Sequence, residues 1–460
     1  MLSVSQFREN TTIALQDVQL QGALKGVSGG MFTNRNNALA EVPDVEQLRD
    51  QLKAIRSATL ARLAEHLEMF ERKAQAAGAV VHWAKDGADA RAIVLDIARR
   101  HDVKLVTKGK SMVTEEIHLN EALAAAGIDP VETDLGEYII QLAEEPPSHI
   151  IAPAIHKNKE QITALLSEVS GRPLDPNNIP ELTAVARQLL REKFLSAGMG
   201  ITGGNIGVAE TGSLVLVENE GNGRMVTTTP RVHVALMGIE KLCATWDDAA
   251  VWLSLLARSA TGQPLSIYTN IITGSRRSDD ADGPEEVHII LVDNNRSKQV
   301  GTKYEEVLQC LRCGACLNAC PVYRKAGGHA YGSPYSGPIG AVVSPLIFGL
   351  EEYEALPHAS TLCGACLDVC PVRIDLPRML LELRADEVER KLVPPLERMA
   401  ERTVAFGFRH EKLMRLGANM GRLIPLPVME VNGRKLPQLA PRSFRQMWKA
   451  GELEGNSEEL

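Results

Sequence analysis

The chain has few aromatic residues, no excess of positive charge and no long apolar run. Aromatic side chains make up 4% of its 460 residues and hydrophobic side chains 44%, an ordinary composition for a globular protein with a sizeable core. The net charge of −8 gives no electrostatic reason to expect nucleic-acid binding, because surfaces that bind nucleic acids are basic. The length suits two or three domains.

Neither a membrane span nor a secretion signal is evident in the sequence. The longest apolar stretch, AVVSPLIFGL at 341–350, is shorter than the roughly 20 residues that a membrane helix needs, and it contains a proline. The first residues, MLSVSQFREN, contain no apolar segment of the signal-peptide type. We therefore expect a cytoplasmic protein, and attachment to the inner face of the membrane as a peripheral protein stays open.

Cysteine is absent from the first 242 residues, and seven of the eight cysteines lie between Cys310 and Cys370. The eighth, Cys243, occupies an apolar position in GIEKLCATW and is predicted to be a buried core thiol. A disulfide framework is not expected in a large chain without an export signal. The clustered thiols therefore indicate a metal centre.

The first cysteine motif, CLRCGACLNACP at 310–321, has the spacing C-x2-C-x2-C-x3-C-P. This spacing is the signature of bacterial ferredoxins, in which three thiolates bind one cubane cluster and the fourth, just before proline, ligates the other cluster. Three thiolates at two-residue gaps lie on a tight loop, and the backbone amides of that loop can donate hydrogen bonds to the cluster sulfides.

The second motif, CGACLDVCP at 363–371, lacks the first cysteine of this pattern, and Ser360 occupies its position. With the crossed pattern, the predicted ligands are Cys310, Cys313, Cys316 and Cys370 for one cluster, and Cys320, Cys363 and Cys366 for the other. We predict two [4Fe–4S] clusters. The second is either a [4Fe–4S] cluster with a serine, water or partner ligand at one iron, or a [3Fe–4S] cluster. A zinc site is the alternative, but seven cysteines in two proline-terminated runs exceed what one zinc ion needs.

The segment between the motifs, 322–362, is longer than in compact dicluster ferredoxins. Its length resembles the helical ferredoxin modules of iron–sulfur subunits in respiratory dehydrogenases. Two adjacent clusters suit a relay, because each takes one electron and a pair can serve a two-electron donor.

Residues 80–293 alternate between short apolar runs and helical patterns, which predicts an α/β fold with a mainly parallel sheet. The expected strands are 79–84, 104–109, 131–135 and 148–154, followed by further strands within 200–221, 231–238, 264–274 and 285–294. The expected helices are 86–101, 111–127, 137–145 and 246–262, with two more at 163–171 and 181–198 on either side of a proline-rich link.

The flanking regions have different patterns. A helix is predicted at 45–78, and the glycine- and asparagine-rich segment 22–39 is interpreted as a loop or extended arm. A further helix is expected at 402–423, and the acidic end 451–460 is expected to be disordered. The predicted domains are an N-terminal helical region (1–75), the α/β domain (76–298), a mainly helical dicluster ferredoxin domain (299–385) and a C-terminal extension (386–460).

A glycine-rich segment at 201–236 stands out in the α/β domain, with Gly203, Gly204, Gly207 and Gly212 around Asn205. Glycine permits positive φ and close approach of the backbone to a ligand. The segment has neither the Rossmann fingerprint nor a P-loop. It is either a ligand-binding loop or a set of tight turns between strands.

Other polar residues are candidates for a site in this domain. Glu210 is a candidate carboxylate or an exposed strand residue, and Lys108, Lys110 and Ser111 lie at a strand-to-helix junction that suits an anion. The alternative for the lysines is a solvated loop. The histidines have no metal-binding spacing and are predicted to be structural or at the surface: His101, His118, His149, His156, His233 and His288.

Three segments, TKGKSMVTEEIHLNEAL, TGGNIGVAETGSLVLVENEGNGRMVTTTPRVHVALMGIEKL and CLRCGACLNACPVY, resemble the lactate utilisation protein B family. This family is the iron–sulfur subunit of a bacterial system that oxidises L-lactate. The resemblance implies a lactate-utilisation domain similar to the sugar-isomerase and CoA-transferase fold, two [4Fe–4S] clusters and a C-terminal extension. It also implies two partners, a cysteine-rich iron–sulfur protein and a second lactate-utilisation-domain protein, that together oxidise L-lactate to pyruvate without NAD.

Three functional hypotheses follow. In the first, the chain is a non-catalytic electron-transfer subunit that passes electrons through two clusters to a respiratory acceptor. A peripheral membrane acceptor or a quinone-linked acceptor is compatible with this hypothesis. In the second, the α/β domain is an enzyme for a small carboxylate or an acyl-CoA, with Glu210 as base or nucleophile, Lys108 holding the anion and the clusters auxiliary. In the third, the chain is a regulatory iron–sulfur sensor, against which the acidic composition argues. The sequence identifies no catalytic residue.

Overall fold

The computed structural model describes residues 2–423, 430–431, 434–435 and 440–452. Two compact units make up the chain, Met1–Asp386 and Glu387–Leu460. The first unit contains the six-stranded and the four-stranded sheet and all eight cysteines.

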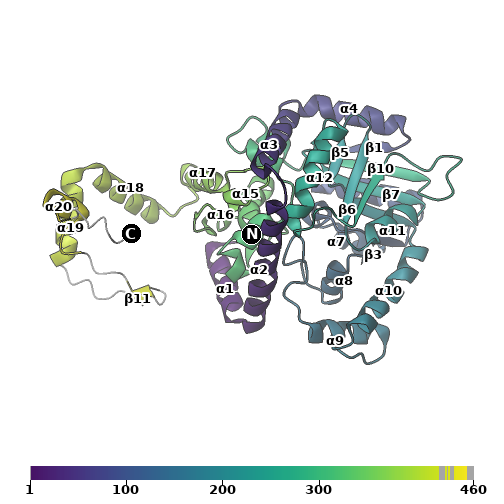
Figure 1. The fold of residues 1–460 in the computed structure, drawn as a ribbon, viewed down its shortest axis with the longest axis horizontal. Coiled ribbons are helices and arrows are strands. Elements are labelled where there is room, and N and C mark those ends of the chain that lie inside the picture. Colours follow the sequence, from purple (N-terminus) through teal and green to yellow (C-terminus); the bar gives the residue numbers. More distant parts are fainter. Residues whose placement is uncertain (1, 424–429, 432–433, 436–439, 453–460) are drawn as a thin grey trace. The chain divides into compact units, whose positions relative to one another are not determined.

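A parallel sheet of six strands forms the centre of the first unit, in the order β1-β10-β7-β4-β2-β3 (Figure 1). The strands are β1 (Val80–Ala84), β2 (Leu105–Lys108), β3 (Asp129–Glu132), β4 (Met199–Gly203), β7 (Val232–Gly238) and β10 (Glu286–Val292). All pairs are parallel. The seven residues of β7 are all buried, as expected for a central strand that is covered on both faces. The predicted α/β fold with a parallel sheet is confirmed.

A second sheet has four strands in the order β8-β5-β6-β9. It is formed by apolar segments that were predicted as strands of the α/β domain. Its strands are β5 (Ile206–Val208), β6 (Ser213–Glu218), β8 (Leu242–Cys243) and β9 (Tyr268–Ile272). The pairs β5–β6 and β6–β9 are antiparallel, and β5–β8 is parallel. The glycine-rich segment therefore crosses from the main sheet at β4 into the smaller one.

Helices fill the connections of the main sheet. They are α5 (Gly87–Arg100), α6 (Met112–Glu116), α7 (Leu119–Ala125), α8 (Leu135–Leu142), α9 (Lys159–Ser170), α10 (Ile179–Ser196), α11 (Asn222–Thr228) and α12 (Trp246–Ala260). Side-chain caps begin most of them: the carboxylate of Asp86, for example, accepts from the amide of Asp89 at the start of α5.

The predicted strand at 148–154 is wrong. This apolar segment is a buried loop, in which the amide of Ser148 donates to the carbonyl of Pro153 at 3.0 Å. The carbonyl of Ser148 accepts from the hydroxyl of Tyr323 at 2.7 Å. Contact with the cysteine-rich region, and not pairing in a sheet, thus explains why Ile150 is buried.

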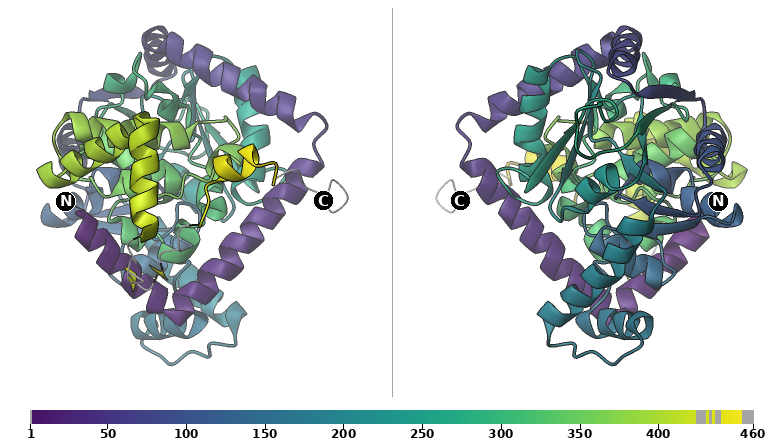
Figure 2. Two further views of the ribbon diagram at one scale, coloured as in Figure 1. Left: turned by 90° about the vertical axis from the view of Figure 1, so that its left-hand side faces the viewer. Right: turned by 90° about the vertical axis from the view of Figure 1, so that its right-hand side faces the viewer.

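The N-terminal region consists of four helices, α1 (Val4–Gln16), α2 (Val18–Ala40), α3 (Val45–Ala61) and α4 (Leu63–Ala76). The predicted loop at 22–39 is therefore wrong, because α2 runs through it. The predicted helix at 45–78 is divided in two at Arg62, where φ is −122°. The helices α1 and α2, purple in Figure 2, form a V, and Leu24 of α2 is fully buried.

The cysteine-rich region is built of short helices. They are α13 (Ala315–Ala319), α14 (Tyr323–Ala326), α15 (Gly337–Phe348), α16 (Ala365–Asp368) and α17 (Leu376–Glu389), with short 3-10 turns between them. Every residue of α15 from Gly337 to Pro345 is buried, so the long segment between the motifs is a packed helix and not an open loop.

The second unit contains α18 (Pro395–Arg409), α19 (Glu411–Leu423), the short pair β11 (Glu430–Val431) and β12 (Arg434–Lys435), and α20 (Phe444–Lys449). The helix predicted at 402–423 is thus two helices. The prediction of disorder at 451–460 falls, from 453 on, outside the described residues. In the part of the chain that the structure describes, no helix is long and apolar enough to cross a membrane.

Candidate metal centre and adjoining cavity

All eight cysteines are free thiols. Cys243 is fully buried, and burial raises its pKa to about 12, so the predicted core thiol is confirmed. The other seven lie around α13 and α16. Among them only Cys363 is exposed.

The fold gathers these seven thiols into two sets whose charges interact. The charge of Cys313 interacts with those of Cys310 and Cys370, and the charge of Cys316 interacts with all three. In the other set Cys366 interacts with Cys320 and Cys363. A charge interaction of Cys316 with Cys366 connects the sets. The sets have the composition of the two predicted ligand groups, and the ligation itself stays a prediction.

Five of the seven thiols are in surroundings that disfavour a free thiolate, whereas hydrogen bonds lower the pKa of the exposed Cys363. Burial raises the pKa of Cys313 and of Cys366 to about 12, and that of Cys370 to about 11. Thiolates are the ligands of iron, and a bound cation reverses this penalty because it stabilises the deprotonated sulfur. The donor set is therefore suited to a metal centre.

The spacing of the thiols does not suit a single zinc ion. With Zn–S bonds of about 2.3 Å, four tetrahedral sulfurs lie about 3.8 Å apart. Among the described residues, only two groups of three potential ligand atoms lie within 4.8 Å of one another, and neither contains a cysteine.

The two motifs have the same backbone geometry. In the first, Arg312 (φ 61°) precedes Cys313 and Gly314 (φ 74°) follows it. In the second, Leu362 (φ 54°) precedes Cys363 and Gly364 (φ 86°) follows it. Left-handed residues turn the chain sharply on both sides of the cysteine, and the two loops are therefore structural repeats.

Amide groups point at the sulfur atoms. The amide of Arg312 donates to Sγ of Cys310 at 3.4 Å, and the amide of Ile374 donates to Sγ of Cys370 at 3.4 Å. At the equivalent place in the second motif, the amide of Leu362 donates to Oγ of Ser360 at 3.1 Å. Such hydrogen bonds stabilise charge on cluster ligands and tune the reduction potential.

Cationic side chains from α2 and α3 hold the two cysteine loops. Nη2 of Arg49 donates to the carbonyls of Asp368 (2.7 Å) and Cys370 (2.8 Å). Equivalent bonds run from Arg35 to the carbonyl of Val369, from Lys53 to that of Arg373 and from Arg56 to that of Leu308. We call these four residues the cation frame. Burial lowers the pKa of Arg56 to about 10, so the side chain stays charged at neutral pH.

The sequence analysis missed the cation frame. One signal could have found part of it: Arg49, Lys53 and Arg56 follow one another at helical spacing, beside the buried Leu52. When a helix face carries both cationic and buried apolar residues, it indicates that the face packs against a segment with unpaired backbone carbonyls or with negative charge.

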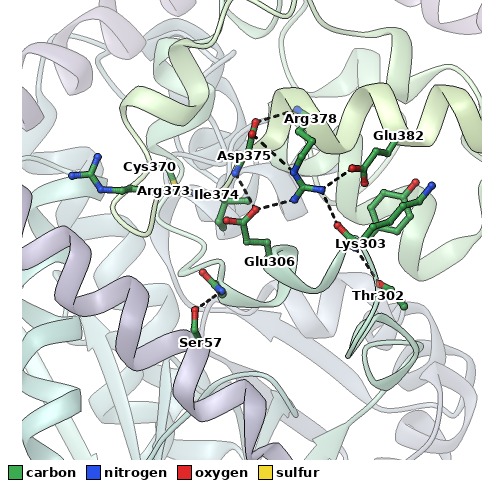
Figure 3. A network of polar contacts seen from close by, with 12 residues as sticks. Ser57, Thr302, Lys303, Glu306, Cys370, Arg373, Ile374, Asp375, Arg378 and Glu382 are labelled. Carbon is green, nitrogen blue, oxygen red and sulfur yellow. Dashed lines mark hydrogen bonds and ion pairs between the residues drawn. The ribbon is translucent and has the colours of Figure 1, made fainter.

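A polar network fixes the loops to each other beside Cys370 (Figure 3). At its centre the guanidinium of Arg378 donates to Glu306 at 3.0 Å and to Glu382 at 2.8 Å. Glu306 precedes the first motif and also accepts from the amide of Asp375, which follows the second, at 3.4 Å. The network therefore couples the two ends of the cysteine-rich region.

A cavity of about 440 Å³ lies between the main sheet and the first cysteine motif. Its lining includes Gly109 to Val113 after β2, Gly204 and Asn205 after β4, and Glu240 and Lys241 after β7. The cysteine-rich region contributes Leu311, Arg312 and Tyr335.

The topology of the sheet explains this position. From β2 the chain moves outward to β3 and then returns to β4 on the other side of β2. The connections after these neighbouring strands diverge, which opens a crevice at their carboxyl ends, the usual ligand site of open parallel sheets.

Of the candidate residues from the sequence, Lys110, Ser111, Gly203, Gly204 and Asn205 line this cavity. Lys108 and Glu210 do not line it, so this cavity does not bring together the base and the anion-holding lysine of the second hypothesis. Lys108 is buried in an ion pair with Glu132 and lies 3.6 Å from Glu115. The carboxylate of Glu210 accepts from the amide of Trp246, at the start of α12, at 2.6 Å.

Most of the four glycines singled out in this segment are required by close packing and not by a positive φ. Gly212 (φ 69°) is the only one of the four with a left-handed backbone. A Cβ on Gly207 would lie 2.6 Å from Leu242, and one on Gly204 would lie 3.0 Å from the sulfur of Met237. Close approach of neighbouring elements therefore accounts for these residues.

The fold brings some of the scattered histidines together. His101 and His288 lie beside Glu286, and His156 lies beside Glu145 and His329, each close enough to share an ion. Hydrogen bonds already join these groups, such as His156 to Glu145 at 2.6 Å. His149 and His233 are buried, and His118 is exposed.

Comparison with known proteins identifies both parts of the first unit. The LUD domain model matches residues 67–292, and the 4Fe-4S dicluster domain model matches 306–374. Lactate utilization protein B of Macrococcus caseolyticus is 46% identical over 424 residues, which are 92% of this chain and 88% of that protein. The chain belongs to the lactate utilization protein B family. The predicted family is thereby confirmed.

Other members of the lactate utilization protein B family cover similar lengths. That of Bacillus subtilis is 42% identical over 434 residues, 93% of this chain and 90% of its own. A protein of Escherichia coli named "Uncharacterized electron transport protein YkgF" is 41% identical over 461 residues, 97% of each chain. The chain is thus an iron–sulfur lactate-utilisation protein. Residues 1–66, which supply the cation frame, lie outside both domain matches.

Proposed function

We propose that the chain is the electron-transfer subunit of a complex that oxidises L-lactate to pyruvate without NAD, and that the electrons pass through two clusters to a respiratory acceptor. The observation that carries this proposal is the pair of cysteine loops with the same backbone turns, which together hold seven thiols within one compact unit. The names of the relatives, one of them an electron transport protein, support the same function.

The stoichiometry agrees with a relay. Oxidation of L-lactate to pyruvate releases two electrons and two protons, and a [4Fe–4S] cluster, when bound, exchanges one electron. The set of Cys310, Cys313, Cys316 and Cys370 is buried or half-buried, whereas Cys363 of the other set is exposed. An inner and an outer centre suit the passage of electrons from a protein interior to a partner.

The proposed partners are a cysteine-rich iron–sulfur protein and a second lactate-utilisation-domain protein, because the family's name implies a system of several subunits. We propose that the complex is peripheral to the inner face of the membrane, where a quinone-linked acceptor is accessible.

For the outer centre we propose a [4Fe–4S] cluster with Ser360 as its fourth ligand. Three observations support Ser360. It occupies the position of Cys310 in a loop with the same turns, its Oγ accepts the equivalent amide bond, and no cysteine remains for that position. In the Ser360→Ala variant the outer centre is expected to change to the [3Fe–4S] form, which Mössbauer spectroscopy detects. An unchanged spectrum means that water or a partner supplies the ligand.

The proposed function is tested on the complex, purified anaerobically through a tag on this chain. Addition of L-lactate is expected to produce the electron paramagnetic resonance signals of reduced clusters. Cys313→Ser should remove the signal of the inner centre, and Cys366→Ser that of the outer one, with iron content measured for both. If only dithionite reduces the clusters, L-lactate is not the electron donor.

A further inference from the structure

The cavity beside the first cysteine motif is lined by four cationic side chains. Lys110, Lys241, Arg296 and Arg312 line the cavity. Arg296 pairs with Glu116 at 2.7 Å and with Glu240 at 2.8 Å. Lys110 donates to the carbonyl of Ile151 at 2.7 Å, and its charge interacts with that of Glu220.

Lys241 and Arg312 form no ion pair with a carboxylate in the described part of the chain. Lys241 is 6% exposed and donates to the carbonyl of Cys310 at 2.5 Å. The guanidinium of Arg312 lies over the ring of Tyr335, 4.4 Å from its centroid, and its Nη1 is buried without a hydrogen-bond partner. The charges of both side chains interact with Glu240, but that carboxylate already pairs with Arg296. An anionic ligand would therefore stabilise buried cations that share a single carboxylate.

The cavity also has an acidic side. Asp134, Glu218 and Glu220 line it, and Glu220 accepts from the amide of Leu135 at 3.0 Å. These carboxylates repel a second negative charge on a ligand. A molecule with one carboxylate fits this distribution, whereas a dicarboxylate or a phosphorylated acid is disfavoured.

We propose that this cavity binds a small 2-hydroxy- or 2-oxomonocarboxylate, with Lys241 and Arg312 holding its carboxylate. The class of ligand rests on the proposed function, in which L-lactate and pyruvate are the substrate and product. The site itself rests on the cavity, its unpaired cations and its position at the point where the sheet topology diverges.

The position joins the ligand to the metal centre. Arg312 lies between Cys310 and Cys313 in the first motif, and Lys241 donates to the backbone of Cys310. A carboxylate held by both side chains changes the charge beside the inner centre. The volume of about 440 Å³ lies within the usual range of small-molecule sites, about 300–1,000 Å³, and leaves space for acids longer than three carbons.

The test measures binding to the cluster-loaded chain in anaerobic calorimetry, with L-lactate, pyruvate, L-malate and inorganic phosphate as probes. L-lactate and pyruvate are expected to bind, and L-malate and phosphate at least about tenfold more weakly. A change in the resonance signal of the dithionite-reduced inner centre on addition of pyruvate provides a second readout.

Lys241→Gln and Arg312→Gln are each expected to raise the Kd for pyruvate about tenfold or more and to remove the change in the signal. Lys104→Gln is the matched control, because Lys104 is exposed and does not line the cavity. Iron and sulfide content is measured in each variant, and Lys241→Gln keeps the test valid if Arg312→Gln loses its cluster.

Three results overturn the inference: no binding of either monocarboxylate, equal binding of all four probes, or unchanged Kd values in both cavity variants. If neither monocarboxylate binds and both variants lose their clusters, the role of Lys241 and Arg312 is to neutralise the charge of the cluster. The proposed function is judged separately: lactate-driven reduction of the complex without binding to this chain leaves that function intact. If the acids bind to this chain but L-lactate does not reduce the clusters of the complex, the binding site is supported and the proposed function is not.

Discussion

At the residue scale, the bonds from Arg49 to two carbonyls of the second cysteine loop are central to the metal centre. Replacement by lysine keeps the charge but removes the paired donors. Hydrogen bonds from a charged group contribute about 1.5–3 kcal/mol each, so Arg49→Lys is expected to speed the loss of the inner cluster to a chelator. Absorbance and iron release check this. Arg62→Lys, which affects an exposed pair with Glu65, should behave as the parent chain.

Gly212 offers a second test at this scale. Its φ is 69°, and an added Cβ would lie 2.1 Å from the amide nitrogen of Ala74 in α4. Gly221 (φ 84°) has no neighbour closer than 3.4 Å. Both substitutions by alanine incur about 1–2 kcal/mol of backbone strain, and Gly212→Ala adds overpacking of about 1–3 kcal/mol. Urea unfolding should therefore rank Gly212→Ala well below Gly221→Ala, and equal losses would show that α4 moves aside freely.

At the element scale, β7 contains a buried histidine that makes stability depend on pH. Burial, with the nearby His288, lowers the pKa of His233 to about 4 from 6.5. Because the unfolded chain takes up a proton first, this stability is present above about pH 6.5 and is lost as pH falls toward 4. Between pH 7 and 5 the loss is about 2 kcal/mol. His233→Gln should reduce the difference in unfolding free energy by that amount. An identical pH profile would mean that the site admits the charged form.

The elements differ in how well the sequence predicts them. The strands between 80 and 132 were predictable, because short apolar runs alternate with capped helical patterns. Helix α2 was not, because four glycines favour a loop in isolation. Its partners explain the difference: a Cβ on Gly29 would lie 3.3 Å from Arg324, and Leu20 and Leu24 cover Gly327. Tertiary contact thus overrides local propensity.

The same distinction holds for the site. The cysteines were predictable from spacing alone, because each motif is local. The cation frame and the cavity were not. The frame depends on contacts such as that of Arg35 with Val369, 334 residues apart, and the cavity depends on a strand order that the sequence does not contain. For Glu210 and Lys108 the sequence does not show the contacts that occupy their charged groups. The carboxylate of Glu210 accepts from the amide of Trp246, and the ammonium of Lys108 pairs with Glu132.

At the scale of the whole molecule, the two units make different contributions. All cysteines and both domain matches lie in the first unit. A chain that ends at Pro394, after α17, is therefore expected to keep the iron content and the visible spectrum of the full chain. Anaerobic purification with iron and sulfide analysis checks this. Loss of the clusters would show that residues 395–460 protect the metal centre.

The distance along the chain between the cation frame and its partners has a consequence for synthesis. Arg49 leaves the ribosome 321 residues before Cys370, and at about 5–20 residues per second this gap lasts roughly 16–64 s. During that time the charged face of α3 has no carbonyls to bind. The bonds of α3 to the second cysteine loop therefore form only after nearly the whole first unit has been made, although α3 is made early.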